Sequence, residues 1–332
     1  MEGDQGHHFL MLLCIASPKG DGMGTFNRTR VTEFIFLGLT NNWMLEILFF
    51  NAFSVTYVLI LLGNMLIVIT IIFTPRLHTP MYFFLSNLSF IDICHSSVTV
   101  PKMLKDLLSE RKTIPFDNCI AQLFFLHLFA CAEIFLLTIM AYDRYAAICT
   151  PLHYPNVMNM RVCLELVFAF WIGATVHSLV QTFLTIRLPY CGPNIINSYF
   201  CDVPPVIKLA CTDTYLTGVL IVSNSGTISL TCFLALVTSY MVILVSLRKK
   251  SAKGRRKALS TCSAHFMVVA LFFGPCIFIY TRPDTSFSMD KVISVFYTVV
   301  TPLLNPLIYT LRNEEVKSAM KQLRTWKEKE PR

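Results

Sequence analysis

Charged side chains are scarce in this sequence. Asp, Glu, Lys and Arg make up 14% of its 332 residues, whereas a soluble domain carries about a quarter. Apolar residues reach 54% and the mean hydropathy is +0.58. A soluble core of this size would need more polar residues to cover it. The composition therefore argues against an ordinary soluble protein and indicates helices that are surrounded by lipid.

The sequence also lacks the patterns of two other membrane-protein classes. It has no internal repeats with paired broken helices, which many transporters contain. Its His and carboxylate residues do not cluster at metal-ligand spacing, and no nucleophile and base accompany them. A membrane enzyme is thus disfavoured. A channel or transporter stays open as an alternative, because buried carboxylates also suit the movement of ions or protons.

Seven apolar stretches are long enough to cross about 30 Å of hydrocarbon at 1.5 Å per residue. They run roughly over residues 49–73, 81–100, 120–142, 162–186, 214–247, 258–281 and 292–311. The first, fifth and seventh contain no charged residue, and the second, third and fourth hold one carboxylate each. The sequence therefore predicts an all-α integral membrane protein with a seven-helix transmembrane domain over residues 49–311.

Basic residues in short loops predict the orientation. The segment 248–257 joins the fifth and sixth spans and contains seven Lys or Arg residues and no acid, so we expect it to be cytoplasmic. Residues 1–48 then lie outside the cell, and the tail 312–332 lies inside. The net charge of +8 is accordingly a topology signal. A nucleic-acid partner is disfavoured because the basic run lies between two spans.

The extracellular segment contains a glycosylation sequon, Asn27-Arg28-Thr29, on the expected outer side. Asn87-Leu88-Ser89 has the same pattern but lies inside the second span, where no glycan could be attached. Residues 1–22 are expected to be disordered or to precede an alternative start at Met23. We expect Asn27 to be glycosylated because of its location.

Four of the twelve cysteines lie on expected outer segments, where an oxidising environment favours disulfides. They are Cys119 at the top of the third span, and Cys191, Cys201 and Cys211 in the loop before the fifth span. Four cysteines permit three pairings, and the spacing alone leaves all three open. Most of the remaining cysteines are expected to be small buried side chains.

Two carboxylates lie in the middle of spans, where an uncompensated charge is costly. Asp92 is in the second span and Glu133 in the third, at similar depth. Because like charges in a low dielectric cannot both stay bare, we expect the pair to share a proton or to hold a cation such as sodium. The alternative is a buried polar pair that has no role in switching.

Helical geometry connects Glu133 with other residues of the third span. Leu126, Glu133 and Arg144 are 7 and 11 residues apart, which at 100° per residue places them within about 20° of one stripe. Near the outer end of this stripe, a mostly apolar lining suits a ligand; it consists of His127, Ala130, Cys131 and Ile134. His127 and Cys131 could also hold a soft metal ion, although core packing is favoured.

The inner end of the stripe carries Asp143-Arg144-Tyr145. An Arg at a span end often extends to the lipid headgroups, but the inward position of Arg144 argues against this. Asn305-Pro306 with Tyr309 is the second inner feature, since Pro breaks the backbone ladder and Asn can satisfy the freed groups. Together these motifs indicate a switch at the cytoplasmic side.

In combination, five stretches resemble the tetrapod-type (class II) odorant receptors of the rhodopsin-like, G-protein-coupled family. These stretches are Leu77 to Leu85, Met140 to Cys149, Cys191 to Cys211, Lys257 to His265 and Pro302 to Tyr309. The resemblance covers about Thr25 to Leu323. It implies a seven-helix receptor with a short amphipathic eighth helix in the tail, located in the plasma membrane of olfactory cilia. An amine receptor would usually have an acid where this chain has Leu126 and His127.

The resemblance also assigns roles to individual residues. It implies the disulfides Cys119 with Cys201 and Cys191 with Cys211, an ion site at Asp92 and Glu133, and an activation switch of Arg144 with Tyr240 and Tyr309. The positions that match the family's odorant pocket are Leu126, His127, Ala130, Cys131, Asn224, Ile228, Phe273, Ile277, Tyr280 and Thr298. One departure is Phe272-Phe273-Gly274 in place of the usual Phe-Tyr-Gly, which removes a hydroxyl near the pocket floor.

The implied partners are a small volatile, mostly apolar odorant, a heterotrimeric stimulatory G protein of the olfactory type and membrane lipid. The G protein would raise cyclic AMP. Apart from a possible sodium ion between Asp92 and Glu133, no cofactor and no enzymatic activity are expected.

Overall fold

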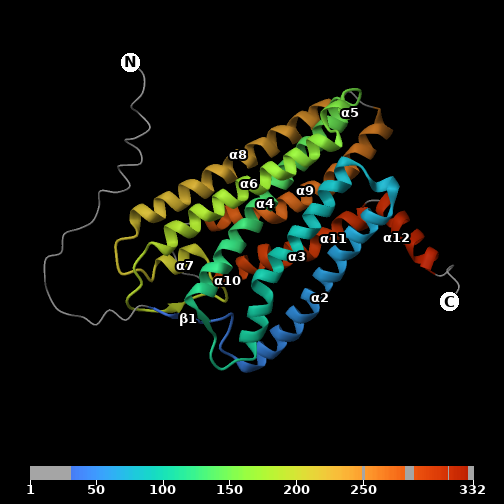
Figure 1. Ribbon diagram of the computed structural model, residues 1–332. Coiled ribbons are helices and arrows are strands. Elements are labelled where there is room, and N and C mark those ends of the chain that lie inside the picture. The colour runs from blue at the N-terminus through green and yellow to red at the C-terminus, as the bar shows by residue number, and fades with distance from the viewer. Residues whose placement is uncertain (1–30, 249–250, 281–287, 313, 328–332) are drawn as a thin grey trace, which may run out of the picture.

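The computed structural model describes residues 31–248, 251–280, 288–312 and 314–327. Its helices run side by side in an elongated bundle (Figure 1). Six helical segments of the described chain are long and apolar enough to cross a membrane; they are α2 (Trp43–Phe73), α3 (Pro80–Leu107), α4 (Phe116–Cys149), α6 (Met160–Ile186), α8 (Tyr215–Leu247) and the stretch Lys291–Tyr309. The sixth predicted span lies in α9 (Ala252–Tyr280), whose described apolar part is His265–Gly274. The seven-helix prediction is confirmed.

Most of the helices extend beyond the predicted apolar stretches, whereas α8 begins one residue after the start of its predicted span. The first begins at Trp43, where the Asn42 side chain accepts hydrogen bonds from Met44 N and Leu45 N and satisfies free backbone donors. The seventh pass is composite, with α10 (Ser288–Val295), a π-helical turn (Phe296–Val300) and α11 (Thr301–Arg312) in series. The sequence analysis did not predict this π-turn.

The surface of the bundle is apolar and its interior holds polar groups. Leu62, Phe168 and Leu216 expose 63%, 70% and 69% of their area, whereas Asp92 and Glu133 expose 0%. This distribution suits lipid as the surrounding medium, because no hydrophobic force drives leucines inward when the solvent is itself hydrocarbon. The arrangement agrees with a multi-pass membrane protein.

A small sheet closes one end of the bundle and departs from the all-α expectation. The strand β1 (Glu33–Phe36) pairs antiparallel with β2 (Thr113–Pro115) and parallel with β3 (Ile195–Ile196). In Figure 1, β1 lies at the same end of the bundle as α7 (Val203–Ile207) and α10. The sheet therefore joins the N-terminal segment to two loops that are distant in sequence.

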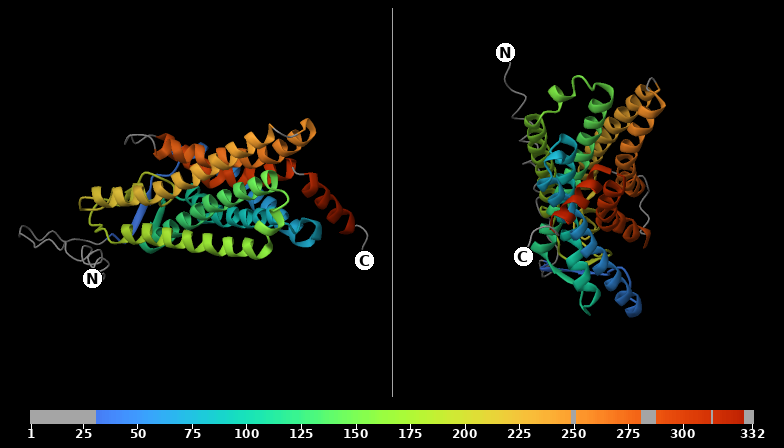
Figure 2. Two further views of the ribbon diagram at one scale, coloured as in Figure 1. Left: turned by 90° about the horizontal axis from the view of Figure 1, so that it is seen from above. Right: turned by 90° about the vertical axis from the view of Figure 1, so that its right-hand side faces the viewer.

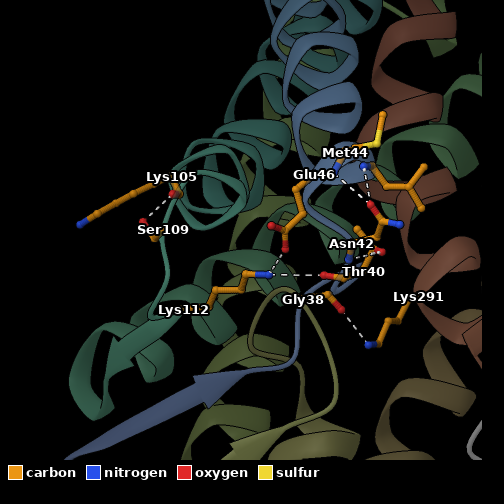
Figure 3. A network of polar contacts seen from close by, with 10 residues as sticks. Gly38, Thr40, Asn42, Met44, Glu46, Lys105, Ser109, Lys112 and Lys291 are labelled. Carbon is orange, nitrogen blue, oxygen red and sulfur yellow. Dashed lines mark hydrogen bonds and ion pairs between the residues drawn. The ribbon is translucent and has the colours of Figure 1, made fainter.

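Ion pairs and hydrogen bonds fasten the N-terminal segment to this end, which we call the sheet end (Figure 3). Lys112 contacts the Glu46 carboxylate, and Lys291 Nζ donates to the Gly38 carbonyl at 2.7 Å. Gly38 has a φ of +70°, a left-handed conformation that suits glycine. The segment that leads from β1 to α2 is thus held by residues from two other parts of the chain.

At the opposite end lie α5 (Tyr154–Val157) and α12 (Glu314–Lys327) (Figures 1 and 2). The helix α12 follows the seventh pass and leaves the bundle at an angle, which agrees with the predicted eighth helix. Val316 and Ala319 of α12 are buried, and Glu315 accepts a hydrogen bond of 2.7 Å from the Tyr82 hydroxyl of α3. These contacts join α12 to the bundle.

Two disulfides at the sheet end join Cys119 with Cys201 and Cys191 with Cys211. This is the pairing that the family resemblance implies. The first bond ties the loop that carries α7 to the first turn of α4, and both of its cysteines are fully buried. The loop is therefore anchored over the bundle.

We predict that Cys119→Ser and Cys201→Ser each reduce cell-surface expression severely. The loss of a native disulfide commonly costs about 2–5 kcal/mol, which is a large part of a protein's stability. Because both changes remove the same bond, the double variant should express no worse than either single variant. Quantitative flow cytometry with an N-terminal epitope tag measures this, and Cys94→Ser, at a free cysteine, is the control. Normal expression of both single variants would contradict the prediction.

Candidate functional site

Three ionisable side chains lie in the middle of the bundle and are 0% exposed: Asp92 and His95 on α3, and Glu133 on α4. Asn305 of α11 donates from Nδ2 to both Asp92 carboxylate oxygens, each at 3.0 Å. His95 Nδ1 lies 3.5 Å from Glu133 Oε2. We call these four residues the intramembrane cluster. It joins the second, third and seventh passes.

The intramembrane cluster has unused hydrogen-bonding capacity. Within the described chain, both Glu133 oxygens, both His95 nitrogens and Asn305 Oδ1 lack a hydrogen-bond partner. Buried groups of this kind are costly unless something satisfies them. Carboxylate and amide oxygens are the ligands that small hard cations prefer, so Asp92, Glu133 and Asn305 fit such an ion. They equally fit a shared proton.

His95 was missed by the sequence analysis, although a signal was present. It lies three residues after Asp92, which places it on the same face of the helix. A histidine at that spacing from a carboxylate in a span should have been read together with it. The imidazole changes the chemistry of the site, because its ring nitrogens can donate or accept a hydrogen bond beside Glu133.

A second polar group lies at the end of the bundle that carries α5. Arg144 Nη2 pairs with Asp143 Oδ2 at 2.7 Å, and Asp143 is only 1% exposed. The Tyr154 hydroxyl donates to Asp143 Oδ1 at 2.8 Å. Burial and the Asp143 charge raise the pKa of Tyr154, so its hydroxyl keeps the proton that it donates. No motif in the sequence pointed to Tyr154.

The other predicted switch residues surround this ion pair. Tyr240 of α8 shares a hydrogen bond with His265 Nδ1 of α9, a partner that the sequence analysis did not identify. Tyr309 of α11 is buried, and its hydroxyl has no hydrogen-bond partner among the described residues. Arg144 is close enough for its charge to act on Tyr240, His265 and Tyr309.

Further members of the predicted switch pack nearby. Tyr145 lies against the apolar cluster of Ile243, Leu247 and Cys262. Pro306 follows Asn305 in α11 and faces Gly63 of α2, where an added Cβ would come within 3.2 Å of the proline ring. The glycine thus allows α2 and α11 to approach closely.

The predicted ligand positions divide into three neighbourhoods toward the sheet end. In the first, Leu126 packs in one apolar cluster with Tyr199 of the disulfide-anchored loop. The Tyr199 and Thr298 hydroxyls are 3.0 Å apart, and both residues are buried. Burial raises the pKa of Tyr199, so its hydroxyl remains protonated. Tyr199 was not predicted, although its place two residues before a disulfide cysteine could have suggested that it reaches the bundle.

The second neighbourhood is polar. Asn224 Nδ2 of α8 and His177 Nδ1 of α6 are 3.2 Å apart, and the rings of His127 and His177 have centroids 6.2 Å apart. His127 Nε2 also lies 3.9 Å from Asp202 Oδ1 of the loop. We call His127, His177, Asn224 and Asp202 the polar corner. His177 was not predicted.

The third neighbourhood is apolar. Cys131, Ile228 and Phe273 belong to the main core, and the Phe273 ring lies 5.7 Å from that of Phe233. Phe273 is buried among apolar side chains. A side chain without a hydroxyl suits this environment, although the family usually has Tyr at this position. Ala130 is half-buried on the same helix. Asn27 and the side chains of Ile277 and Tyr280 fall outside the described part of the chain, so their predicted roles stay predictions.

Comparison with known sequences gives a consistent result. The sequence model of a family described as "Olfactory receptor" matches residues 53–327. The chain is 86% identical to olfactory receptor 4E2 of Mus musculus over 302 residues, which cover 91% of this chain and 98% of that protein. It is 84% identical to olfactory receptor 4E2 of Homo sapiens (91% and 96% covered) and 66% identical to olfactory receptor 4E1 of Homo sapiens (88% and 93% covered).

We predict that His95 and Glu133 are energetically coupled. His95→Leu leaves a carboxylate buried without its neighbour, and Glu133→Leu leaves an imidazole, so each single change should lower the thermal stability of the purified protein. The double change removes both groups and should cost less than the sum, with a coupling of about 0.5–3 kcal/mol. Thermal unfolding in detergent or nanodiscs measures this.

A matched control pairs Glu133→Leu with Glu165→Gln, because Glu165 is exposed and forms its ion pair with Arg161. These two changes should be additive. Additive behaviour of His95→Leu and Glu133→Leu would show that the two groups do not interact.

Proposed function

The chain belongs to the olfactory receptor family, and we propose that it binds small volatile, mostly apolar odorants within the bundle and activates a stimulatory, olfactory-type G protein that raises cyclic AMP. Membership makes it an odorant receptor of the plasma membrane rather than an enzyme. The proposal adds the location of the ligand, the identity of the transducer and the mechanism that connects them.

The ligand site is proposed toward the sheet end, between the first and third neighbourhoods. Leu126, Cys131, Ile228 and Phe273 supply the apolar contacts that bind a hydrocarbon skeleton. Asn224 and His177 of the polar corner supply hydrogen-bonding groups on one side only. An odorant with one oxygen-bearing group would therefore bind in a preferred orientation.

The switch is proposed at the opposite end, and the observation that carries it is the buried Asp143. Its carboxylate holds Arg144 and accepts a hydrogen bond from Tyr154. While both contacts persist, the Arg144 guanidinium stays beside Tyr240 and Tyr309. Outward movement of the inner part of α9 would break the contact between Tyr240 and His265. This movement would uncover Arg144, and release from Asp143 would then let Arg144 bind the C-terminal helix of a G-protein α subunit.

Helix α9 is suited to such a movement. It begins at Ala252, after the basic run, and Pro275 in its later part cannot donate a backbone hydrogen bond. A ligand can shift the equilibrium between two bundle arrangements only by its difference in affinity for them. Contacts to Phe273 on α9 would supply that difference.

The intramembrane cluster lies between the ligand site and the switch, and we propose that it holds one proton or one small cation in the resting state. The neutralising charge would keep α3, α4 and α11 together. Movement of α11 would then change the affinity for that charge. Sodium or pH should accordingly modulate basal activity.

A channel is the second candidate, since buried carboxylates also occur along ion pathways. It predicts a ligand-gated current that needs no G protein. The receptor proposal predicts that signalling disappears when the G protein is absent.

We predict that Arg144→Ala abolishes the odorant-evoked cyclic AMP response while surface expression persists. Asp143→Asn should raise basal signalling because it weakens the ion pair. Tyr154→Phe removes one hydrogen bond to Asp143, worth about 0.5–1.5 kcal/mol, and should raise basal signalling by a smaller factor. A cyclic AMP reporter in cells that express the olfactory stimulatory α subunit measures all three, with Glu165→Gln as the control. A fully active, surface-expressed Arg144→Ala receptor would refute the mechanism.

We predict that Asn224→Leu weakens oxygen-bearing agonists and spares hydrocarbon agonists of similar size. One lost hydrogen bond of about 0.5–1.5 kcal/mol corresponds to roughly a two- to tenfold increase in the half-maximal concentration. Dose-response curves for both agonist sets test this. Ile228→Leu, which keeps the apolar volume, is the control and should affect both sets alike. Equal loss for both sets in Asn224→Leu would mean that Asn224 is structural.

A further inference from the structure

A groove of about 610 Å³ lies between the ends of α3 and α4 that approach the sheet end. Its lining contains no residue of the intramembrane cluster and none of the predicted ligand positions, and its Val98 also packs against the apolar cluster that contains Leu126. Its lining changes in character along its length. Lys105, Asn118 and Thr113 line the part near the loop between the two helices. Val98 and Phe125 line the part farther from that loop.

The residues that line the groove include two lysines, Lys102 and Lys105, and no acid. Lys102 pairs with Asp106 and lies 5.2 Å above the Phe36 ring, so its charge is compensated within the protein. Lys105 is exposed, and its ammonium has no hydrogen bond or ion pair among the described residues. In Figure 3 its side chain extends away from the contacts of Lys112 and Lys291. Of the two lysines that line the groove, Lys105 is thus the one without an ion-pair partner in the described part of the chain.

The wall of the groove is held in place by Gln122. Its Nε2 donates to the Val98 carbonyl of α3 at 2.9 Å, and its Oε1 accepts from Cys201 N at 2.8 Å. Cys201 is itself bonded to Cys119 at the start of α4. The groove is consequently preformed, and a ligand would not have to separate α3 from α4.

The lining residues extend from Lys105 to Ser97 on α3 and from Asn118 to Phe125 on α4, and both helices span the membrane. Its cationic part lies at the level of the loop, where lipid headgroups are found. Its apolar part lies at the level of the acyl chains, and Phe125 is 45% exposed there. A free anion would use only the first part, and a sterol would leave Lys105 without a counter-charge.

We propose that this groove binds one glycerophospholipid of the outer leaflet, with its phosphate at Lys105 and an acyl chain along Val98 and Phe125. The Lys105 ammonium attracts the negatively charged phosphate that every glycerophospholipid headgroup carries. The phosphate accepts charge-assisted hydrogen bonds from the Lys105 ammonium and a hydrogen bond from the Asn118 amide. The bound lipid completes the outer surface between α3 and α4.

The test reconstitutes the full-length receptor in nanodiscs that contain phosphatidylglycerol, phosphatidylcholine and cholesterol. After the receptor is released from the nanodiscs, native mass spectrometry counts the lipids that remain bound to it. Wild type should retain phosphatidylglycerol. Lys105→Gln should reduce its occupancy about fivefold, the effect of one lysine at a membrane surface, and Lys105→Arg should restore it. Lys208→Gln, on the same side but outside the groove, is the matched control and should have no effect.

Ala121→Trp fills the groove without changing its charge, and it should expel the lipid. Ala121→Leu fills less of it and should give an intermediate occupancy, which separates displacement from misfolding. Three results would overturn the proposal: displacement of the lipid by inorganic phosphate, retention of cholesterol in its place, or an unchanged phosphatidylglycerol count in both Lys105→Gln and Ala121→Trp. The first would indicate a free-anion site, the second a sterol site, and the third lipid bound elsewhere.

Discussion

The absence of water in the hydrocarbon layer is the constraint on which the rest of this structure depends. Polar groups inside a membrane must find partners within the protein. The spans of this chain place Asp92, His95, Glu133 and Asn305 in one location, where they are shielded from lipid. Leucines and phenylalanines occupy the outer surfaces instead. The positions of the polar residues therefore determine which face of each helix turns inward.

The two ends of the bundle are stabilised in different ways. At the sheet end, two disulfides, a three-stranded sheet and the contacts of Lys112 and Lys291 hold the loops together. At the opposite end, no disulfide joins the described helices, and the polar contacts between segments are single interactions, such as Tyr154 with Asp143 and Tyr240 with His265. Such contacts break at a much lower cost than a disulfide. A transition between two arrangements would thus change the second end and preserve the first.

Much of this architecture was predictable because membrane spans have a strong sequence signal. Length and apolar composition fixed the seven passes, and helical periodicity placed Leu126, Glu133 and Arg144 on one stripe. The π-turn at Phe296–Val300 and the two-residue strand β3 were not predictable. Both depend on contacts between distant segments. Tyr154 and His177 were not predicted for the same reason, since no local sequence pattern connects Tyr154 with Asp143 or His177 with Asn224.

Charge alone does not distinguish the two predicted occupants of the intramembrane cluster. Two ionised carboxylates carry a charge of −2, which is costly in a low dielectric. One added cation and one added proton would each reduce this charge by the same amount. They differ in size and coordination, because a cation requires several oxygen ligands, whereas a proton requires only two oxygens in contact. The oxygens of Glu133 and Asn305 that lack a hydrogen-bond partner can serve either, so the distance between the helices that carry them would select between the two proposed occupants. A change in the separation of α4 and α11 would then favour one occupant over the other, and it would couple the proposed occupant to the conformation of the proposed switch.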